Sequence, residues 1–174
     1  MNGQEFFDCV VVGGGPAGAT AADELARSGW STLLLDKAGR IKPCGGAIPP
    51  RAIRDYGIPD DLLVAKVGAA RIIAPSERHV DMPIEGGFVG MVDREHFDEW
   101  LRARAARNGA QRRKGTFTKL ERDKDGTSIV RYLERSPGNG DSTEKAVRAR
   151  AVIGADGALS KVARQSIPAS RAMP

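Results

Sequence analysis

The sequence predicts an α/β fold with a parallel sheet, and three observations near its start lead to that prediction. Residues 8–12 end in three consecutive valines, and residues 33–35 are three consecutive leucines, so both segments have the composition of buried strands. Residues 13–18 follow the first strand directly and carry the glycine spacing G-x-G-x-x-G. Asp36 ends the second strand. Strand, glycine turn, helix, strand and carboxylate, in this order, form a dinucleotide-binding βαβ unit of Rossmann type.

The residues of this turn each have a physical role in such a unit. Gly13 allows the tight turn off the strand, Gly15 lets the backbone approach a pyrophosphate, and Gly18 lets the helix pack against the sheet. Pro16 fits the first helical turn, whose free N–H groups and dipole attract phosphate. Asp36 is placed to accept hydrogen bonds from ribose, and it would repel a 2′-phosphate, so we expect FAD or NAD here. The alternative is a glycine-rich turn that binds nothing.

The middle of the chain, residues 39–92, predicts only short elements, and its first part, residues 39–61, is rich in turn residues. Proline and glycine recur throughout it, and its apolar runs are brief. We expect helical turns at residues 51–56 and 60–65, and extended segments at residues 69–75, 79–83 and 87–92.

A longer helix is predicted directly after this segment. Asp93 is a suitable N-cap, Glu95 lies in the first turn, and Asn108-Gly109 ends the pattern, which gives a helix over residues 94–107. Its apolar stripe consists of Phe97, Trp100, Leu101 and Ala105.

The last third of the chain returns to strands. Residues 117–122 and 127–134 alternate in polarity and predict a hairpin that turns at a Lys-Asp-Gly sequence. Residues 145–154 alternate at first and then become apolar at residues 151–153, which predicts a strand that enters a covered parallel sheet. A short helix is expected from Ser160.

These elements predict one nucleotide-binding domain over residues 1–174 with a β-rich insertion. The domain would be assembled from about residues 1–44, 93–120 and 145–174, and residues 45–92 would belong to a substrate-binding layer.

Length and composition place the chain among soluble globular proteins. It has 174 residues, of which 41% are hydrophobic and 28% are charged. No apolar run approaches the ~20 residues that cross a bilayer, and no signal-peptide pattern precedes the first strand, so we expect a cytoplasmic protein. Cys9 and Cys44 have no metal-ligand spacing and make no disulfide framework, so we expect neither a metal site nor a disulfide.

Charge is distributed unevenly along the chain. Residues 1–100 carry a net charge of −5, and residues 101–174 carry a net charge of +10. Basic groups such as residues 112–114 could face nucleic acid, an anionic membrane or a phosphorylated ligand. Acidic residues are interleaved with them, which favours solvent-exposed faces of strands, and no nucleic-acid-binding motif is present. We therefore expect no nucleic-acid partner.

Three further motifs accompany the glycine turn. Residues 42–46 read Lys-Pro-Cys-Gly-Gly, residues 91–101 read Met-Val-Asp-Arg-Glu-His-Phe-Asp-Glu-Trp-Leu, and residues 154–157 read Gly-Ala-Asp-Gly. With the turn at residues 13–18, they resemble the N-terminal part of the geranylgeranyl reductase family, most of all its chlorophyll and bacteriochlorophyll branch. This family belongs to the flavoprotein superfamily that also contains the aromatic hydroxylases. The family's members are longer, and the resemblance implies that their C-terminal half is absent from this chain.

The resemblance implies an FAD-dependent oxidoreductase that uses NADPH as reductant. Its substrate would be a geranylgeranyl chain, free as the diphosphate or esterified to a pigment, whose isolated C=C bonds are reduced to give phytyl. Peripheral association with the cytoplasmic membrane is compatible with such a substrate, and the sequence does not indicate an oligomeric state. Two alternatives are a flavin-dependent aromatic monooxygenase and an FAD-binding fragment without activity.

The resemblance also implies roles for individual residues. Arg94 would contact the phosphate or ribityl side of the flavin, the alternative being a solvated arginine on the helix surface. Asp156 would hold the flavin chain from the other side, or cap a helix, or do both. Cys44 is the candidate for a catalytic residue, because its loop would lie near the isoalloxazine ring, where the thiol either shapes the pocket or affects the substrate. The implied cofactor-binding residues are Gly13, Gly15, Pro16, Ala17, Gly18, Asp36, Cys44, Gly45, Gly46, Arg94, Asp156 and Gly157.

Overall fold

The computed structural model describes residues 4–37, 44–135 and 141–167. The chain divides into two compact units, which we describe separately. Unit 1 comprises residues 1–39 and 100–174, and unit 2 comprises residues 40–99. Among the described residues, no helix is both long and apolar enough to span a membrane.

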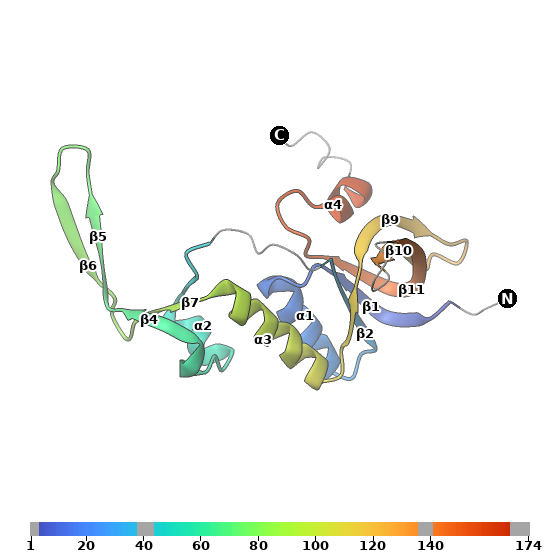
Figure 1. The fold of residues 1–174 in the computed structure, drawn as a ribbon, viewed down its shortest axis with the longest axis horizontal. Coiled ribbons are helices and arrows are strands. Elements are labelled where there is room, and N and C mark those ends of the chain that lie inside the picture. The colour runs from blue at the N-terminus through green and yellow to red at the C-terminus, as the bar shows by residue number, and fades with distance from the viewer. Residues whose placement is uncertain (1–3, 38–43, 136–140, 168–174) are drawn as a thin grey trace. The chain divides into compact units, whose positions relative to one another are not determined.

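A six-stranded mixed sheet forms the centre of unit 1 (Figure 1). Its strand order is β8-β2-β1-β11-β10-β9, in which β8, β2, β1 and the end of β11 run parallel, whereas β11, β10 and β9 are antiparallel neighbours. The α/β prediction with a parallel strand pair at the start is therefore confirmed. The strands are β1 (Phe6–Val12), β2 (Thr32–Asp36), β8 (Gln111–Lys114), β9 (Thr116–Arg122), β10 (Ser128–Arg135) and β11 (Ser142–Gly154).

Strand β11 takes part in both halves of this sheet. Residues 142–149 pair with β10, and residues 148–154 pair in parallel with β1. The change to an apolar sequence at residues 151–153 marks the parallel part, as predicted. The prediction that this part of the sheet is covered on both faces is only partly confirmed. Val152 packs against the core, whereas Ile153 remains exposed in the described structure.

The helices begin and end where local signals place them. In unit 1, α1 (Pro16–Arg27) connects β1 to β2 and ends before Gly29, which has φ +83°. Helix α3 (Arg94–Arg107) has the predicted bounds, and the Asp93 carboxylate accepts the Glu95 N–H at 2.9 Å. Of its predicted apolar stripe, Phe97, Leu101 and Ala105 are buried, and Trp100 is partly exposed. A short helix, α4 (Lys161–Ser166), follows β11.

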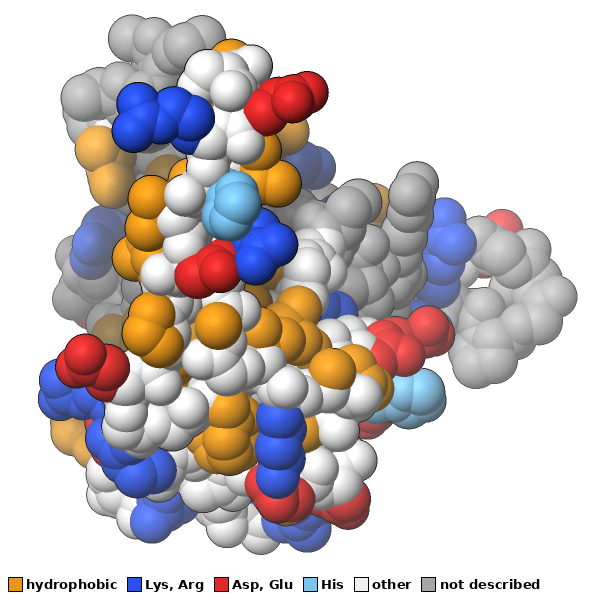
Figure 2. Space-filling view, turned by 90° about the vertical axis from the view of Figure 1, so that its left-hand side faces the viewer, with side chains coloured by type: hydrophobic (Ala, Val, Ile, Leu, Met, Phe, Trp, Pro, Cys, Tyr) orange, Lys and Arg blue, Asp and Glu red, His pale blue; other side chains and the backbone are white. Residues whose placement is uncertain are grey.

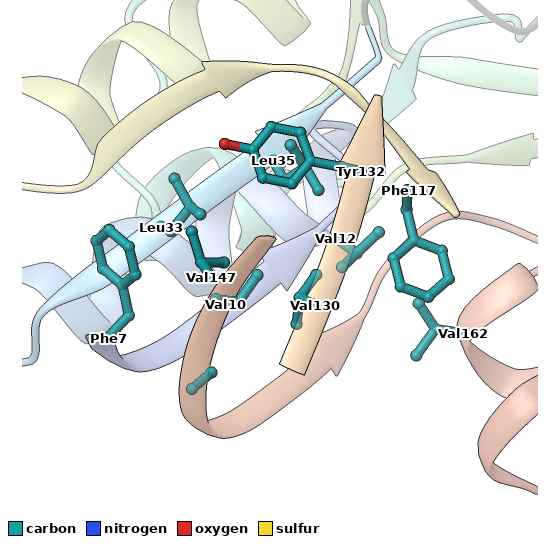
Figure 3. Packing of buried hydrophobic residues seen from close by; sticks show 11 residues of the cluster. Phe7, Val10, Val12, Leu33, Leu35, Phe117, Val130, Tyr132, Val147 and Val162 are labelled. Carbon is teal, nitrogen blue, oxygen red and sulfur yellow. The ribbon is translucent and has the colours of Figure 1, made fainter. Parts of the chain in front are cut away.

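The core of unit 1 lies between the parallel strands and the antiparallel strands (Figure 3). Because alternate residues of a strand share one face, Val10 and Val12 of β1 lie beside Leu33 and Leu35 of β2. Opposite them are side chains from β9, β10 and β11, and α4 contributes one more residue. These residues are Phe117, Val130, Tyr132, Val147, Ala149 and Val162.

Strand β8 was not predicted as a strand, because its sequence Gln-Arg-Arg-Lys has no apolar alternation. It is the edge strand beside β2, where charged residues are common. The basic residues 112–114 are expected on a solvent-exposed face of a strand, but the Arg113 side chain is partly buried. Its guanidinium lies 2.7 Å from the Glu5 carboxylate and 5.6 Å from the centre of the Phe7 ring.

Unit 2 contains only small sheets. A three-stranded sheet has the order β3-β7-β4, and β5 pairs with β6 as a separate hairpin. The hairpin and the short helix near residue 51 confirm the predictions. The helix expected over residues 60–65 is half wrong, because Leu63 already pairs with Val92 in a sheet. The elements are β3 (Ala47–Ile48), α2 (Pro50–Asp55), η1 (Asp60–Leu62), β4 (Leu63–Val67), β5 (Ala69–Ile73), β6 (His79–Pro83) and β7 (Val89–Val92).

The β5–β6 hairpin is exposed along its whole length. Ile72 and Val80 face each other across it and are 59% and 63% exposed. Figure 2 views this part of the chain, and apolar side chains lie at the surface there beside charged ones. Arg71 donates two hydrogen bonds to Asp81, at 2.6 and 2.9 Å, on the other face of the ribbon.

Candidate functional site

The glycine turn of unit 1 is packed tightly against its neighbours. The Gly13 N–H donates to the Leu35 carbonyl at 2.8 Å, and Gly13 has φ +108°. A Cβ at Gly13 would lie 2.4 Å from the Ala155 oxygen, and one at Gly18 would lie 1.9 Å from the Gly13 oxygen. The tight turn expected at Gly13 and the close helix packing expected at Gly18 are therefore both present, and residues 154–157 lie against the turn.

The start of α1 is open to an anion. Gly15 is the N-cap, Pro16 occupies the first helical position, and among the described residues no side chain caps the helix and no acid lies in its first turn. Its chain neighbours apart, no described residue has an atom within 4 Å of the position that a Gly15 Cβ would take. Free N–H groups at the positive end of a twelve-residue helix, beside open space, suit a pyrophosphate group.

The Asp36 carboxylate lies at the end of β2, directly beside the turn. It accepts the Gly14 N–H at 3.1 Å, and Arg102 Nη1 lies 3.8 Å from its second oxygen. The same Arg102 nitrogen donates to the Gly14 carbonyl at 3.0 Å. Sequence reasoning did not identify Arg102, because it lies 88 residues from Gly14 and belongs to no motif.

Asp156 caps the short helix α4, which was one of its two expected roles. Its carboxylate accepts the N–H groups of Lys161 at 2.7 Å and Val162 at 3.3 Å, as well as the hydroxyl of Ser160. Ser160 in turn accepts the Ala163 N–H at 2.9 Å. These bonds hold residues 154–157 in the position where the Ala155 N–H reaches the Val12 carbonyl at 2.8 Å.

In unit 2, the end of the Pro-Cys-Gly-Gly motif is attached to β7. The Val92 N–H donates to the Gly46 carbonyl at 3.0 Å, and Ala47 pairs with Met91. Gly46 has φ +70°, and a Cβ there would lie 2.1 Å from the Val92 oxygen, so the approach requires glycine. Lys42 and Pro43 lie outside the described residues. Two segments that are far apart in the sequence thus meet immediately before Arg94.

Arg94 is held in a defined orientation. Its guanidinium donates two hydrogen bonds to Asp98, at 2.8 and 2.9 Å, and is also hydrogen-bonded to Cys44. The Arg94 side chain is 20% exposed and that of Asp98 5%, so the alternative of a solvated surface arginine is wrong. Asp98 keeps the pKa of Arg94 above its ordinary value, and the guanidinium stays charged. The sequence signal for Asp98 is its spacing of four residues from Arg94 on a helix.

The two cysteines differ in acidity and exposure. The Gly46 N–H, 3.5 Å from the sulfur, lowers the pKa of the Cys44 thiol, and Arg94 lowers it further. Burial raises the pKa of the Cys9 thiol. Cys44 is exposed, and within the part of the chain that the structure describes, only the neighbours of Gly45 in the sequence lie within 4 Å of the position that a Gly45 Cβ would take. Cys44 is therefore the more acidic and the more accessible thiol.

Comparison with known proteins is consistent with this geometry. A family described as an FAD binding domain matches residues 7–173. A geranylgeranyl diphosphate reductase of Rhodobacter capsulatus is 57% identical over 165 residues, which are 95% of this chain and 41% of that protein. The chloroplastic geranylgeranyl diphosphate reductase of Oryza sativa is 40% identical over 88% of this chain and 35% of its own length.

A solved structure has a similar fold. The geranylgeranyl bacteriochlorophyll reductase-like protein of Thermoplasma acidophilum superimposes with a TM-score of 0.76 at 30% identity. The match covers 89% of this chain and 40% of that one. The chain therefore spans about two-fifths of the length of the relatives that it matches.

Proposed function

The chain belongs to the family of FAD-binding domains, and from that premise we propose that it is the cofactor-binding part of a geranylgeranyl reductase. The reaction is the reduction of isolated C=C bonds of a geranylgeranyl chain to give phytyl. One observation carries this proposal: 57% identity, over nearly the whole chain, to a protein named geranylgeranyl diphosphate reductase.

The candidate residues of each unit, taken separately, fit FAD. In unit 1, the backbone around Gly13, Gly15 and Gly18 and the open start of α1, with Pro16 and Ala17, would hold the pyrophosphate. Asp36 would accept the adenosine ribose hydroxyls. Asp156 and Gly157 would hold the flavin chain, because their turn packs on Gly13. In unit 2, Arg94 would bind the phosphate or ribityl side with its fixed positive charge, and residues 44–46 would line the flavin.

A plain alkene accepts hydride poorly, so its reduction needs a hydride and a proton delivered together. FAD held by these residues would supply the hydride, with NADPH as the reductant. The residues of this chain would bind and orient the cofactor, and they would exclude water from the reacting groups. Cys44 is our candidate for a side chain that contacts the substrate, because it is exposed, is followed by two glycines and lies beside Arg94.

We assign residues 45–92 to the substrate side of the protein, and about residues 1–44, 93–120 and 145–174 to the FAD-binding domain. The apolar side chains of the β5–β6 hairpin support this assignment, because a prenyl chain is a hydrocarbon. The chain is carried either by a free diphosphate or by a pigment. A cytoplasmic protein in contact with the membrane surface would reach either carrier.

The test measures products. The purified protein, with FAD and NADPH and without oxygen, is given geranylgeranyl diphosphate or geranylgeranyl-esterified pigment, and the extracted chain is analysed by mass spectrometry. We expect two added hydrogens for each reduced bond, and faster turnover with NADPH than with NADH. Hydroxylation of an aromatic substrate in air would point to a monooxygenase. Bound FAD without any product would identify a module that binds the cofactor and has no activity.

A further inference from the structure

We propose that Arg102 is a positioning residue for the adenosine end of the bound dinucleotide, which it orients through Asp36 and Gly14. The inference rests on the binding of FAD and is independent of the prenyl substrate. All of its residues belong to unit 1.

Asp36, Gly14 and Arg102 contact one another. Asp36 Oδ1 accepts the Gly14 N–H at 3.1 Å, and Arg102 Nη1 donates to the Gly14 carbonyl at 3.0 Å. Arg102 Nη1 also lies 3.8 Å from Asp36 Oδ2. Both polar groups of Gly14 are therefore held by side chains, one from the end of β2 and one from the middle of α3. Since Gly14 directly precedes Gly15, these contacts set the direction of the peptide that leads into α1.

The identity of residue 14 supports this arrangement independently. Position 14 is a variable position of the G-x-G-x-x-G pattern, so the pattern alone does not require glycine there. A Cβ at Gly14 would lie 2.7 Å from Asp36 Cγ and 3.0 Å from Arg102 Cδ. A side chain at position 14 would therefore have to displace the Asp36 and Arg102 side chains, which pack across it.

Charge and burial explain what Arg102 contributes. The side chains of Arg102 and Asp36 are 15% and 24% exposed, so water screens their interaction only partly. Without Arg102, the Asp36 carboxylate would repel the phosphates of the nucleotide. Arg102 offsets that charge, and the Asp36 carboxylate is the group that would accept hydrogen bonds from the ribose hydroxyls.

The test compares nucleotides that differ at the ribose. Affinities of ADP and 2′-deoxy-ADP are measured by displacement of FAD, which is followed by flavin fluorescence, for the wild type, Arg102→Met, Arg102→Lys and Asp36→Ala. Arg107→Met is the matched control, since Arg107 is an exposed arginine in the last turn of the same helix. Thermal unfolding of each variant without nucleotide is recorded in parallel.

We expect the wild type to bind ADP about 10-fold more tightly than 2′-deoxy-ADP, the value of one hydrogen bond to a charged group. Arg102→Met should weaken ADP binding about 10- to 100-fold and remove most of this preference, as Asp36→Ala does. Arg102→Lys should retain part of the affinity for ADP and part of the preference over 2′-deoxy-ADP, because lysine keeps the charge and lacks the planar fork of arginine. Arg107→Met should match the wild type.

Three results would overturn the proposal. One is a preference for ADP over 2′-deoxy-ADP that survives in Arg102→Met. Another is an equal loss of affinity for both nucleotides together with a lower melting temperature, which would mark a residue needed only for folding. The third is a wild-type protein that binds neither nucleotide. Failure to reduce a prenyl chain would overturn the proposed function and would leave this readout unaffected.

Discussion

The two units of this chain use strands of similar apolar content in opposite ways. In unit 1, Val10 and Val11 of β1 are completely buried, because β1 has a paired strand on each side and a packed layer over it. In unit 2, every residue of β5 and β6 is exposed, including Ile72 and Val80. A two-stranded ribbon has too few neighbours to bury either face. Apolar residues therefore favour the formation of a strand. Whether they are buried depends on the other strands and helices that pack against that strand.

One part of unit 2 is buried, unlike its exposed hairpin. Val92, Phe97 and Asp98 are buried where β7 meets the start of α3. This is also where Gly46 is bonded to Val92 and where Cys44 lies beside Arg94. The well-packed part of unit 2 is thus the part that carries the sequence motifs, and the exposed hairpin carries none.

The largest difference is expected between core and hairpin substitutions of similar size. Leu33→Ala should lower the free energy of unfolding by about 2–5 kcal/mol, since Leu33 is fully buried and leaves a cavity. Ile72→Ala should change it by no more than about 0.5 kcal/mol. Urea unfolding of both variants decides this, and equal losses would show that the hairpin is buried in solution.

Within unit 1, two glycines of one turn should behave differently. Gly18→Ala places a methyl group against the Gly13 carbonyl and should cost about 1–3 kcal/mol of stability as well as FAD affinity. The methyl group of Gly15→Ala meets no atom of the described residues beyond its chain neighbours, so the change should leave the stability without FAD unchanged and still weaken FAD binding. Thermal unfolding and FAD titration separate the two effects. A Gly15→Ala variant with normal FAD affinity would contradict the pyrophosphate assignment.

In the well-packed part of unit 2, the buried carboxylate should matter more than an exposed one. Asp98→Asn leaves Arg94 partly buried without a charged partner and should cost about 1–3 kcal/mol. Asp55→Asn is the matched control, because Asp55 pairs with Arg51 at the same helical spacing on an exposed surface. Chemical unfolding should show no measurable change for the control. Similar losses in both variants would mean that burial of the Arg94–Asp98 pair does not decide its contribution.

The smallest effect concerns reactivity and not stability. Because the pKa of Cys44 is lowered and that of Cys9 is raised, alkylation of the folded protein should modify Cys44 alone, at a lower pH than an ordinary thiol with a pKa of about 8.5. Arg94→Met should move this pH profile upward, since less thiolate is present at a given pH. The Gly46 N–H would still lower the pKa of Cys44 in this variant.

Peptide mass mapping across a pH series makes this measurement. Cys44→Ser is the control and should abolish labelling until the protein unfolds. A profile that does not move in Arg94→Met would show that Arg94 has no influence on the thiol.

Local signals account for the elements that were predicted correctly. The glycine turn, the bounds of α3 and the hairpin of β9 and β10 all depend on residues that lie within a few positions of one another. The two errors have the opposite origin. Residues 63–67 form β4 because they pair with β7, and residues 111–114 form β8 because β2 offers them an edge. Neither partner lies nearby in the sequence.

The sequence by itself determined the α/β class, the turn at residues 13–18, the place of Asp36 and the resemblance that leads to FAD. Only the tertiary structure decided that Arg102 holds Gly14 and Asp36, and that Arg94 meets both Cys44 and Asp98. The physical reason is the distance along the chain between the residues that interact. Turns, caps and alternation arise from neighbours along the chain, whereas these side-chain contacts depend on how distant segments pack in three dimensions.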